Sequence, residues 1–287
     1  MFFYLALGNY FFSDRLIFDL KKTMTNLVSI VITNYNRYPL VNQAIYSALK
    51  FTSKIGGKVI LVDDASIDDS YKRINTKFQS AIKSGKLILL RNKINLGVTA
   101  SKNRGFLKAK SKWVGFLDSD DLILNDSILL IKNILLDYFD KPLIFMKCVD
   151  QNGRLVGIKF DQIQEIDIKR FLTYTTYGEV FGFFNKEIIK FKPYDEDLRG
   201  YEGIGCARII KKYGSALLLP HVIRCYNQFS PNRLSNKIFT DRAKFIALGH
   251  KRILEEFYEE LNLKQKLVFL LKVFMYRILS LLYEEKQ

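Results

Sequence analysis

Apolar runs and amphipathic stretches alternate along the first part of the chain. Four runs with little polar alternation are expected to be parallel strands covered on both faces, at residues 27–33, 58–64, 86–92 and 112–118. The segments between them have helical spacing, at residues 38–51, 66–82 and 97–110, and Ser66 is the candidate N-cap of the second helix. Strands and helices that alternate about every 25–30 residues are typical of a doubly wound α/β sheet.

The pattern becomes less regular after about residue 142. Further apolar runs predict strands at 142–150, 153–160 and 179–185, the second being an edge strand after an Asn152-Gly153 turn. A helix is predicted over 201–213, then short strands around 215–227, then helices from Thr240 onward. The predicted fold class is therefore α/β, with a mostly parallel doubly wound sheet, a mixed second half and a C-terminal helical tail.

Polar side chains follow the carboxyl end of each of the first four predicted strands. They are Thr33 and Asn34, then Asp63 and Asp64, then Arg91 and Asn92, then Asp118, Asp120 and Asp121. Open α/β sheets bind ligands in the crevice outside those ends. We therefore expect these side chains, although far apart in the sequence, to share one crevice.

The composition restricts the classes of binding partner but does not identify a single one. With 287 residues and 48% hydrophobic content, the chain can bury a large core. The formal net charge of +16, from 45 basic and 29 acidic residues, indicates an anionic partner. Phosphates, an anionic membrane leaflet and nucleic acid all fit that charge.

Cysteine and histidine content limits the metal chemistry. Cys148, Cys206 and Cys225 are odd in number and widely spaced, which argues against a disulfide framework and a thiolate zinc site and indicates a reducing compartment. Because only 2 histidines are present, a metal ion would be held mainly by oxygen. That ligand set favours Mg²⁺ or Mn²⁺ over zinc.

Asp118 and Asp120 form a D-x-D at the end of the fourth predicted strand. Carboxylates from alternate residues can reach one divalent ion and leave positions open for a phosphate group. The competing interpretation is that these aspartates only cap the following helix. Taken alone, so short a pattern does not separate the two interpretations.

Several ordered segments together are more specific than the D-x-D alone. The stretches "VSIVITNYNR" (28–37), "VILVDDASIDDS" (59–70) and "NLGVTASKNRGFLKAKSKWVGFLDSDDLI" (95–123) resemble, in this order, the nucleotide-binding half of the family-2 glycosyltransferases, which have the Rossmann-like GT-A fold. The resemblance is strong over about residues 27–125 and continues loosely to about 235.

This resemblance implies a domain organisation. A GT-A domain would cover 24–235, with a nucleotide-sugar-binding half over 24–125 and an acceptor half over 126–235. Residues 1–23 would be an N-terminal extension, too short in its apolar run for the roughly 20 residues of a membrane span. Residues 236–287 would be the helical tail.

The resemblance also implies roles on the donor side. Tyr35, in the turn that begins at Thr33, would stack near the nucleotide base. Asp64 would hydrogen-bond the base, with Asp63 beside it. A pair of acids in a turn is otherwise a common solvated helix start.

Two cations and the D-x-D complete the implied donor site. Lys102 stands where the family commonly has arginine and offers a point charge instead of a bidentate fork, and Arg104 is a second cation. Asp120 would ligate the metal directly, while Asp118 would reach the ion or the ribose, with Ser119 between them. Either cation could instead be solvated on an exposed helix face.

An inverting transfer in a single displacement needs a base for the incoming hydroxyl group. In the family this base is an acid near a helix start, often within Glu-Asp, and the sequence has Glu202 followed by Gly203. Glu202 is therefore the nominated base, although an acid there can also serve only the helix dipole. The alternative bases are Asp195, Glu196 and Asp197. Arg233, in a late loop, resembles a cation that reaches the diphosphate.

The segment 264–287 is apolar around most of its circumference but contains Lys272 and Arg277. Such a helix can lie in a membrane interface with its cations reaching the headgroups, or it can pack on the domain or on a partner. We expect a cytoplasmic protein that is peripheral on the inner face of the cytoplasmic membrane.

These observations predict a metal-dependent, inverting glycosyltransferase of bacterial surface-polysaccharide type. Its donor would be a nucleoside-diphosphate sugar, UDP-linked by preference, and its acceptor a polysaccharide or lipid-linked oligosaccharide. A nucleotidyltransferase would carry a Gly-rich phosphate loop after the first strand, which "TNYNRYPL" lacks. A nucleic-acid-binding protein is supported only by charge, and an inactive relative only by Gly203.

Overall fold

The computed structural model describes residues 26–124, 126, 128–173, 178–227 and 239–284. The predictions for the extension 1–23 and for Arg233 lie outside these residues.

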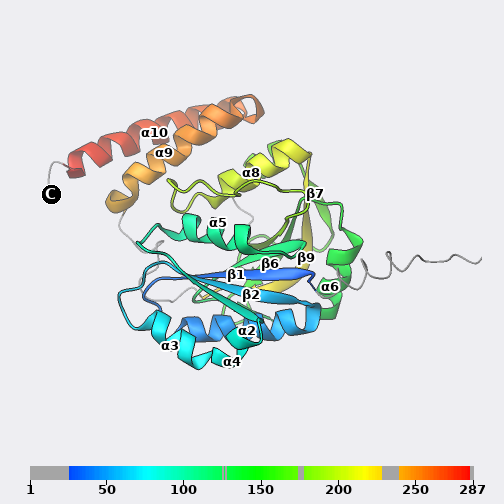
Figure 1. Cartoon of the computed structure of the whole chain (residues 1–287). Coiled ribbons are helices and arrows are strands. Elements are labelled where there is room, and N and C mark those ends of the chain that lie inside the picture. Colours follow the sequence, from blue (N-terminus) through cyan, green and yellow to red (C-terminus); the bar gives the residue numbers. More distant parts are fainter. Residues whose placement is uncertain (1–25, 125, 127, 174–177, 228–238, 285–287) are drawn as a thin grey trace, which may run out of the picture.

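The first half of the chain is a doubly wound unit (Figure 1). Its strands are β1 (Val28–Asn34), β2 (Gly57–Asp63), β3 (Leu87–Arg91) and β4 (Trp113–Asp118), and its helices are α2 (Val41–Ile55), α3 (Ser70–Lys77), α4 (Gln79–Lys83) and α5 (Val98–Lys108). The strands are parallel in the order β3-β2-β1-β4. The predicted doubly wound sheet is confirmed.

The helix predicted over 66–82 differs from the structure in two respects. It begins at Ser70 and is divided at Phe78 into α3 and α4. Ser66 is not its N-cap, because the Ser66 hydroxyl group donates a hydrogen bond of 2.6 Å to Asp63 Oδ1. The Ser66 side chain therefore stabilises the turn after β2 instead of capping a helix.

The second half extends the same sheet with mixed strands. Its elements are β5 (Leu122–Ile123), α6 (Ile128–Asp137), β6 (Leu143–Val149), β7 (Gln164–Ile166), α7 (Ile168–Thr173), β8 (Val180–Asn185), α8 (Glu202–Tyr213) and β9 (Ala216–Cys225). Strand β8 lies antiparallel between β4 and β6, and β9 runs parallel to β6 and antiparallel to β5 and β7.

Two predicted strands of this half are corrected by the structure. The segment 153–160 forms no strand, and only Leu155 bridges Val149. Gly153 has a φ of 75°, so the predicted turn is present, but the chain does not continue along β6 after it. The short strands expected around 215–227 are one continuous strand, β9.

Apolar side chains pack on both faces of the sheet because successive strand residues point to opposite sides. Val28, Ile30 and Ile32 of β1 belong to the core under α2 and α6. Val31 belongs to the opposite core, under α5 and α8. The first face carries α2, α3 and α4 in Figure 1, and the second carries α5 and α8.

The C-terminal helices form an outer layer over α8 (Figure 1). Helix α9 (Phe239–Phe257) is followed by η2 (Tyr258–Glu260) and by α10 (Leu263–Glu284), which returns alongside α9. A third core joins the layer to the domain, with Phe257, Leu261 and Phe269 packed on Leu198 and Ile204. No helix in the described part of the chain is long and apolar enough to cross a membrane.

Helix α5 lies very close to β1 at Gly105. A Cβ atom on Gly105 would lie 2.3 Å from Val31 Cγ1, so no larger residue fits without movement. This contact holds the second half of α5 directly against the middle of β1.

We predict that Gly105→Ala destabilises the protein by about 1–3 kcal/mol, the usual cost of overpacking a filled core. Urea denaturation measures the difference. Gly203→Ala is the matched helical control, because nothing lies within 4 Å of a Cβ atom there. The control should be neutral or stabilise by up to about 1 kcal/mol, the helix propensity difference. Equal effects of the two substitutions would contradict the close packing of α5.

Candidate active site

A cavity of about 1070 Å³ opens at the carboxyl ends of the parallel strands. Its walls come from the ends of β1 and β4, the start of α5, the start of α8 and the inner face of β8 and β9. Of the residues predicted for the site, those that line it are Thr33, Tyr35, Asp64, Lys102, Asp118, Ser119, Asp120 and Glu202. The expected shared crevice therefore exists, but four of the strand-end residues expected there do not line it: Asp63, Arg91, Asn92 and Asp121.

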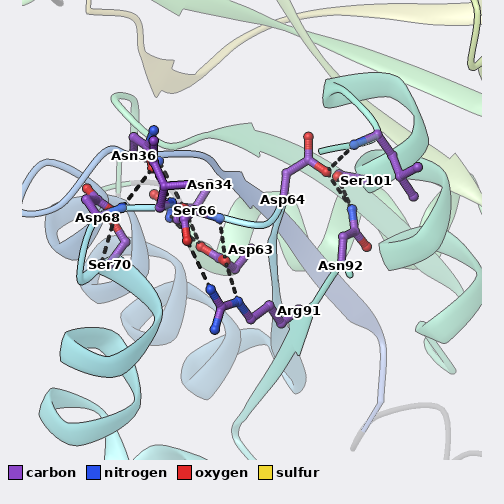
Figure 2. A network of polar contacts seen from close by, with 12 residues as sticks. Asn34, Asn36, Asp63, Asp64, Ser66, Asp68, Ser70, Arg91, Asn92 and Ser101 are labelled. Carbon is purple, nitrogen blue, oxygen red and sulfur yellow. Dashed lines mark hydrogen bonds and ion pairs between the residues drawn. The ribbon is translucent and has the colours of Figure 1, made fainter. Parts of the chain in front are cut away.

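Asp63 does not line the cavity. Its buried carboxylate accepts hydrogen bonds from Asn34 Nδ2 at 2.9 Å and from the backbone N–H of Ser66 at 3.0 Å. Arg91 pairs with it at 3.6 Å, and Figure 2 shows these groups gathered around the turn. Asp63 thus ties the end of β1 to the turn after β2, which is a structural role in place of the predicted contact with a nucleotide.

Asp64 reaches the cavity from the same turn but faces other partners (Figure 2). Its Oδ1 accepts hydrogen bonds from Asn92 Nδ2 at 2.6 Å and from the N–H of Leu96 at 2.9 Å, and its Oδ2 accepts one from the N–H of Gly97 at 2.8 Å. A carboxylate has about four lone-pair sites, so these donors occupy most of them. Asp64 shapes the loop that leads into α5.

Arg104 also lies outside the cavity wall. Its guanidinium group donates to the carbonyl oxygen of Arg91 at 2.7 Å and to Asn92 Oδ1. The Arg104 side chain points back along β3, so it stabilises the end of that strand and does not face the cavity. Of the two cations predicted on α5, only Lys102 faces the cavity.

Lys102 lies between the D-x-D and the nominated base. Its Nζ is 3.2 Å from Asp118 Oδ1 and 3.2 Å from Glu202 Oε1, and the residue is only 8% exposed. Burial opposes its charge, but the two carboxylates outweigh burial and raise the pKa of Lys102 above its ordinary value. Lys102 therefore remains an ammonium group throughout the working pH range.

The pKa of Asp118 is also set by burial and by nearby charges. Burial opposes its ionisation, but Lys102, Arg224 and Arg37 together outweigh burial and lower the pKa of Asp118 below its ordinary value. The side chain of Asp118 is still 40% exposed toward the cavity. It is thus an ionised carboxylate that a ligand can reach.

The other two aspartates of the cluster point in different directions. Asp120 lines the cavity and pairs with Arg37 at 2.9 Å. Asp121 turns away toward β9, where it accepts a hydrogen bond from the N–H of Asn227 at 2.9 Å and lies 3.5 Å from Arg224. Burial is the main reason that the pKa of Asp121 rises to about 7. Only two of the three carboxylates therefore face the cavity.

Asp118 and Asp120 suit a divalent ion that arrives with phosphates. No group of three or more acidic, histidine or cysteine side chains in the described ranges is arranged to hold an ion by itself. Mg²⁺ sites commonly use one or two carboxylates and complete their shell with substrate phosphates and water. The donor set fits that kind of site, and Arg37 and Lys102 balance the charge of the two carboxylates.

Glu202 is the only one of the four nominated acids that lines the cavity. Asp195 pairs with Arg208 at 2.7 Å, Asp197 pairs with Arg252 at 3.0 Å and Glu196 pairs with Lys192 at 2.9 Å. Asp195 and Asp197 face α9 through Arg252, whereas Glu196 also accepts a hydrogen bond of 3.1 Å from Asn103 of α5. The structure therefore favours Glu202 among the candidates.

Gly203 follows Glu202 on the cavity wall, and a Cβ atom there would meet nothing within 4 Å. The family often has an acid at this position, whereas this chain has glycine. The position borders the open cavity. Glu202 thus has free space beside it.

Four charged residues on the cavity wall were not predicted. Arg37 follows β1, Arg199 precedes α8, Arg224 is in β9 and Glu179 precedes β8. Arg224 and Glu179 pair at 2.8 Å. Arg37 could have been found from its position just after a strand end, whereas a loop arginine and a strand arginine of the irregular half carry no such signal.

We predict that Lys102→Met destabilises the protein at pH 7, because Asp118 and Glu202 would then repel each other without a cation. The cost should be about 1–3 kcal/mol, less than the roughly 3–5 kcal/mol for a fully buried pair, since Asp118 is 40% exposed. Urea denaturation at several pH values measures it. Lys108→Met, at an exposed position of the same helix, is the control.

The pH dependence follows from the lowered pKa of Asp118. Its stabilising contribution is present above the unfolded-state pKa of about 3.9 and is lost as pH falls through the lower folded-state pKa. The stability difference between wild type and Lys102→Met should therefore be largest at neutral pH and narrow toward about pH 3. A difference that does not change with pH would rule out this charge balance.

Comparison with known proteins identifies relatives of part of this chain. Residues 29–151 match the family model for glycosyl transferase family 2. An uncharacterized glycosyltransferase of Haemophilus influenzae is 37% identical over 102 residues, which are 36% of this chain and 39% of that protein. The GalNAc(5)-diNAcBac-PP-undecaprenol beta-1,3-glucosyltransferase of Campylobacter jejuni is 28% identical over 180 residues, which are 61% of this chain and 57% of that protein. The matched parts span less than two thirds of either relative.

A solved structure extends the likeness to most of the fold. TarS 1–349 of S. aureus, in complex with UDP-GlcNAc, matches 87% of this chain and 72% of its own with a TM-score of 0.62 and 18% identity. The curled, largely parallel sheet with helices on both faces is thus a GT-A-like α/β fold.

Proposed function

Residues 29–151 of this chain belong to glycosyltransferase family 2, and on that premise we propose that the protein transfers a sugar from a nucleoside-diphosphate sugar to a hydroxyl group of a glycan or lipid-linked oligosaccharide. One observation supports this proposal most directly. The Lys102 ammonium group joins Asp118 of the donor side and Glu202 of the acceptor side, at 3.2 Å from each, inside one cavity.

The donor occupies the part of the cavity near β1 and the start of α5. Tyr35, which is 42% exposed and on the wall, stacks against the base, and Thr33 lies beside it. Asp64 keeps the Leu96 and Gly97 amides in place and so defines the far edge of this pocket. UDP is the preferred carrier, in line with the UDP-GlcNAc bound to the structural neighbour TarS.

The diphosphate lies near Asp118, Ser119 and Asp120. Asp118 and Asp120 would hold Mn²⁺ or Mg²⁺, which neutralises the diphosphate charge as the glycosidic bond breaks. Arg37 and Lys102 are placed to contribute positive charge to the same region. Because fixed charges need no reorganisation at the moment of reaction, they stabilise the leaving group efficiently.

The acceptor hydroxyl group approaches from the side of α8. Glu202 accepts its proton, since Lys102 contacts only Oε1 and leaves Oε2 to bind the hydroxyl group. With one base and one displacement, the configuration of the transferred sugar inverts. Open space at Gly203 admits the acceptor ring next to Glu202.

We further propose that α10 rests on the inner leaflet of the cytoplasmic membrane. Its exposed side chains include many large apolar ones, at Leu263, Leu267, Leu270, Leu271, Phe274, Met275, Ile278, Leu281 and Leu282. Lys264 and Arg277 are exposed on the same helix and can reach anionic headgroups. A relative whose name includes an undecaprenol-linked substrate supports a surface where lipid-linked acceptors lie.

The donor site predicts a nucleotide-specific, metal-dependent gain in stability. Thermal unfolding should be delayed by UDP with Mn²⁺, since a ligand of the native state at 100 times its Kd adds about 2.7 kcal/mol. Asp120→Ala should abolish this gain, and Asp161→Ala, at an exposed site away from the cavity, should keep it. Glu202→Gln should keep the gain and lower sugar transfer by about 100-fold or more.

The outcomes separate donor binding from chemistry. If no nucleoside diphosphate stabilises the folded wild-type protein with Mn²⁺ or Mg²⁺, the transferase assignment is wrong. If UDP binds but Glu202→Gln transfers sugar at the wild-type rate, Glu202 is not the base.

Membrane contact predicts co-sedimentation with vesicles that contain phosphatidylglycerol and weaker binding to pure phosphatidylcholine. Replacing Leu271 and Phe274 together by Glu should abolish binding, because two buried charges would oppose insertion. Leu129→Glu alters an equally exposed leucine on α6, far along the chain from α10, and should leave binding unchanged. Equal binding by all three proteins would exclude α10 as the membrane surface.

A further inference from the structure

The segment from Tyr194 to Glu202 separates the cavity from the C-terminal helices. Its inner side reaches the cavity wall through Tyr194, Arg199, Gly200 and Glu202. Between Tyr194 and the start of α8 it forms no helix or strand. Its conformation therefore depends on side-chain contacts with the elements on either side.

Asp195 is the centre of an ion network on the outer side of this segment. It accepts two hydrogen bonds of 2.7 Å from Arg208 of α8 and one of 3.1 Å from Arg252 of α9. Arg252 also binds Asp197 at 3.0 Å, and Arg208 also binds Glu256 of α9. Networks with bidentate arginines are worth more than isolated surface pairs, so α9 holds this segment firmly.

Gly249 provides a second contact between α9 and the segment. A glycine inside a helix costs about 1 kcal/mol relative to alanine, so a specific reason for it is expected. A Cβ atom on Gly249 would lie 2.5 Å from Cδ1, Cε1 and Cζ of Tyr201. The Tyr201 hydroxyl group also lies 3.1 Å from His250 Nδ1 and 3.3 Å from the Ile246 carbonyl oxygen.

Tyr201 immediately precedes Glu202, and Leu198 is buried in the core shared with Phe257 of α9. The outer side of the segment is thus fastened at Asp195, Asp197, Leu198 and Tyr201. The inner side carries Glu202, and among the described residues its side chain accepts one hydrogen bond, from Lys102 Nζ at 3.2 Å.

From these contacts we infer that α9 is part of the catalytic unit, with Arg252 and Gly249 as positioning residues for Glu202. They act on Glu202 through Asp195, Asp197 and Tyr201 and do not touch the cavity themselves. The inference rests on the proposed function, because positioning matters only if Glu202 takes a proton. A misplacement of about 1 Å by a change far from the chemistry can cost about 100-fold in rate.

Arg252→Met in the full chain tests the inference, with Lys251→Met as the matched control. Lys251 is the neighbouring cation on α9, exposed, and paired only with Glu255 of its own helix among the described contacts. Amide hydrogen exchange of residues 195–202 should become faster in Arg252→Met and stay unchanged in Lys251→Met. The kcat for sugar transfer should fall by about 10- to 100-fold in Arg252→Met alone.

Two further measurements distinguish positioning from loss of fold. UDP affinity of Arg252→Met, by calorimetry, should stay within about three-fold of wild type, because the donor side is untouched and only kcat is affected. Arg252→Lys should recover part of the rate, since a lysine can reach Asp195 or Asp197 but does not provide the planar fork for both.

Gly249→Ala is an independent perturbation of the same position. It should raise exchange in 195–202 and lower kcat, although alanine normally stabilises a helix. Unchanged exchange in both Arg252→Met and Gly249→Ala would overturn the inference, as would faster exchange with an unchanged kcat. If wild-type protein transfers no sugar, the proposed function fails, and the exchange result still decides whether α9 holds the segment.

Discussion

The buried ammonium group of Lys102 determines how the cavity can be built. Two carboxylates, Asp118 from the end of β4 and Glu202 from the start of α8, come within 3.2 Å of it. Without a cation between them, their repulsion in a partly desolvated site would oppose the approach of α8 to the sheet. The pair of contacts therefore joins the regular and the irregular halves of the chain at the point where the reaction is proposed to occur.

This arrangement depends in turn on the packing of α5. Gly105 lets the helix lie directly on Val31 of β1, and Asp64 fixes the amides of the loop that begins it. Helix α5 then presents Lys102 to the cavity while Arg104, two residues on, points back to β3. A glycine, a turn carboxylate and a lysine thus act together, because only a close and fixed helix can hold a buried charge at both carboxylates.

On the far side, the site depends on parts of the chain outside the parallel sheet. Helix α9 fastens the segment before α8 through Arg252 and Gly249, and α10 packs alongside α9. The apolar exposed face of α10 and the ion network of α9 therefore belong to the same outer pair of helices. A surface that holds α10 would hold the α8 side of the cavity in a defined orientation.

The amino-acid sequence by itself determined the doubly wound sheet and the gathering of Thr33, Tyr35, Asp118 and Asp120 at one edge. Strand and helix periods are local properties, and parallel strands bring their carboxyl ends together whatever the later packing. Tertiary structure alone decided that Asp63 serves a turn while its neighbour Asp64 reaches the cavity, since adjacent residues point to opposite sides. It also decided the pairing of Lys102 with Glu202 and the role of Arg252, because these contacts join residues from 55 to 100 positions apart, and no local pattern records such distances.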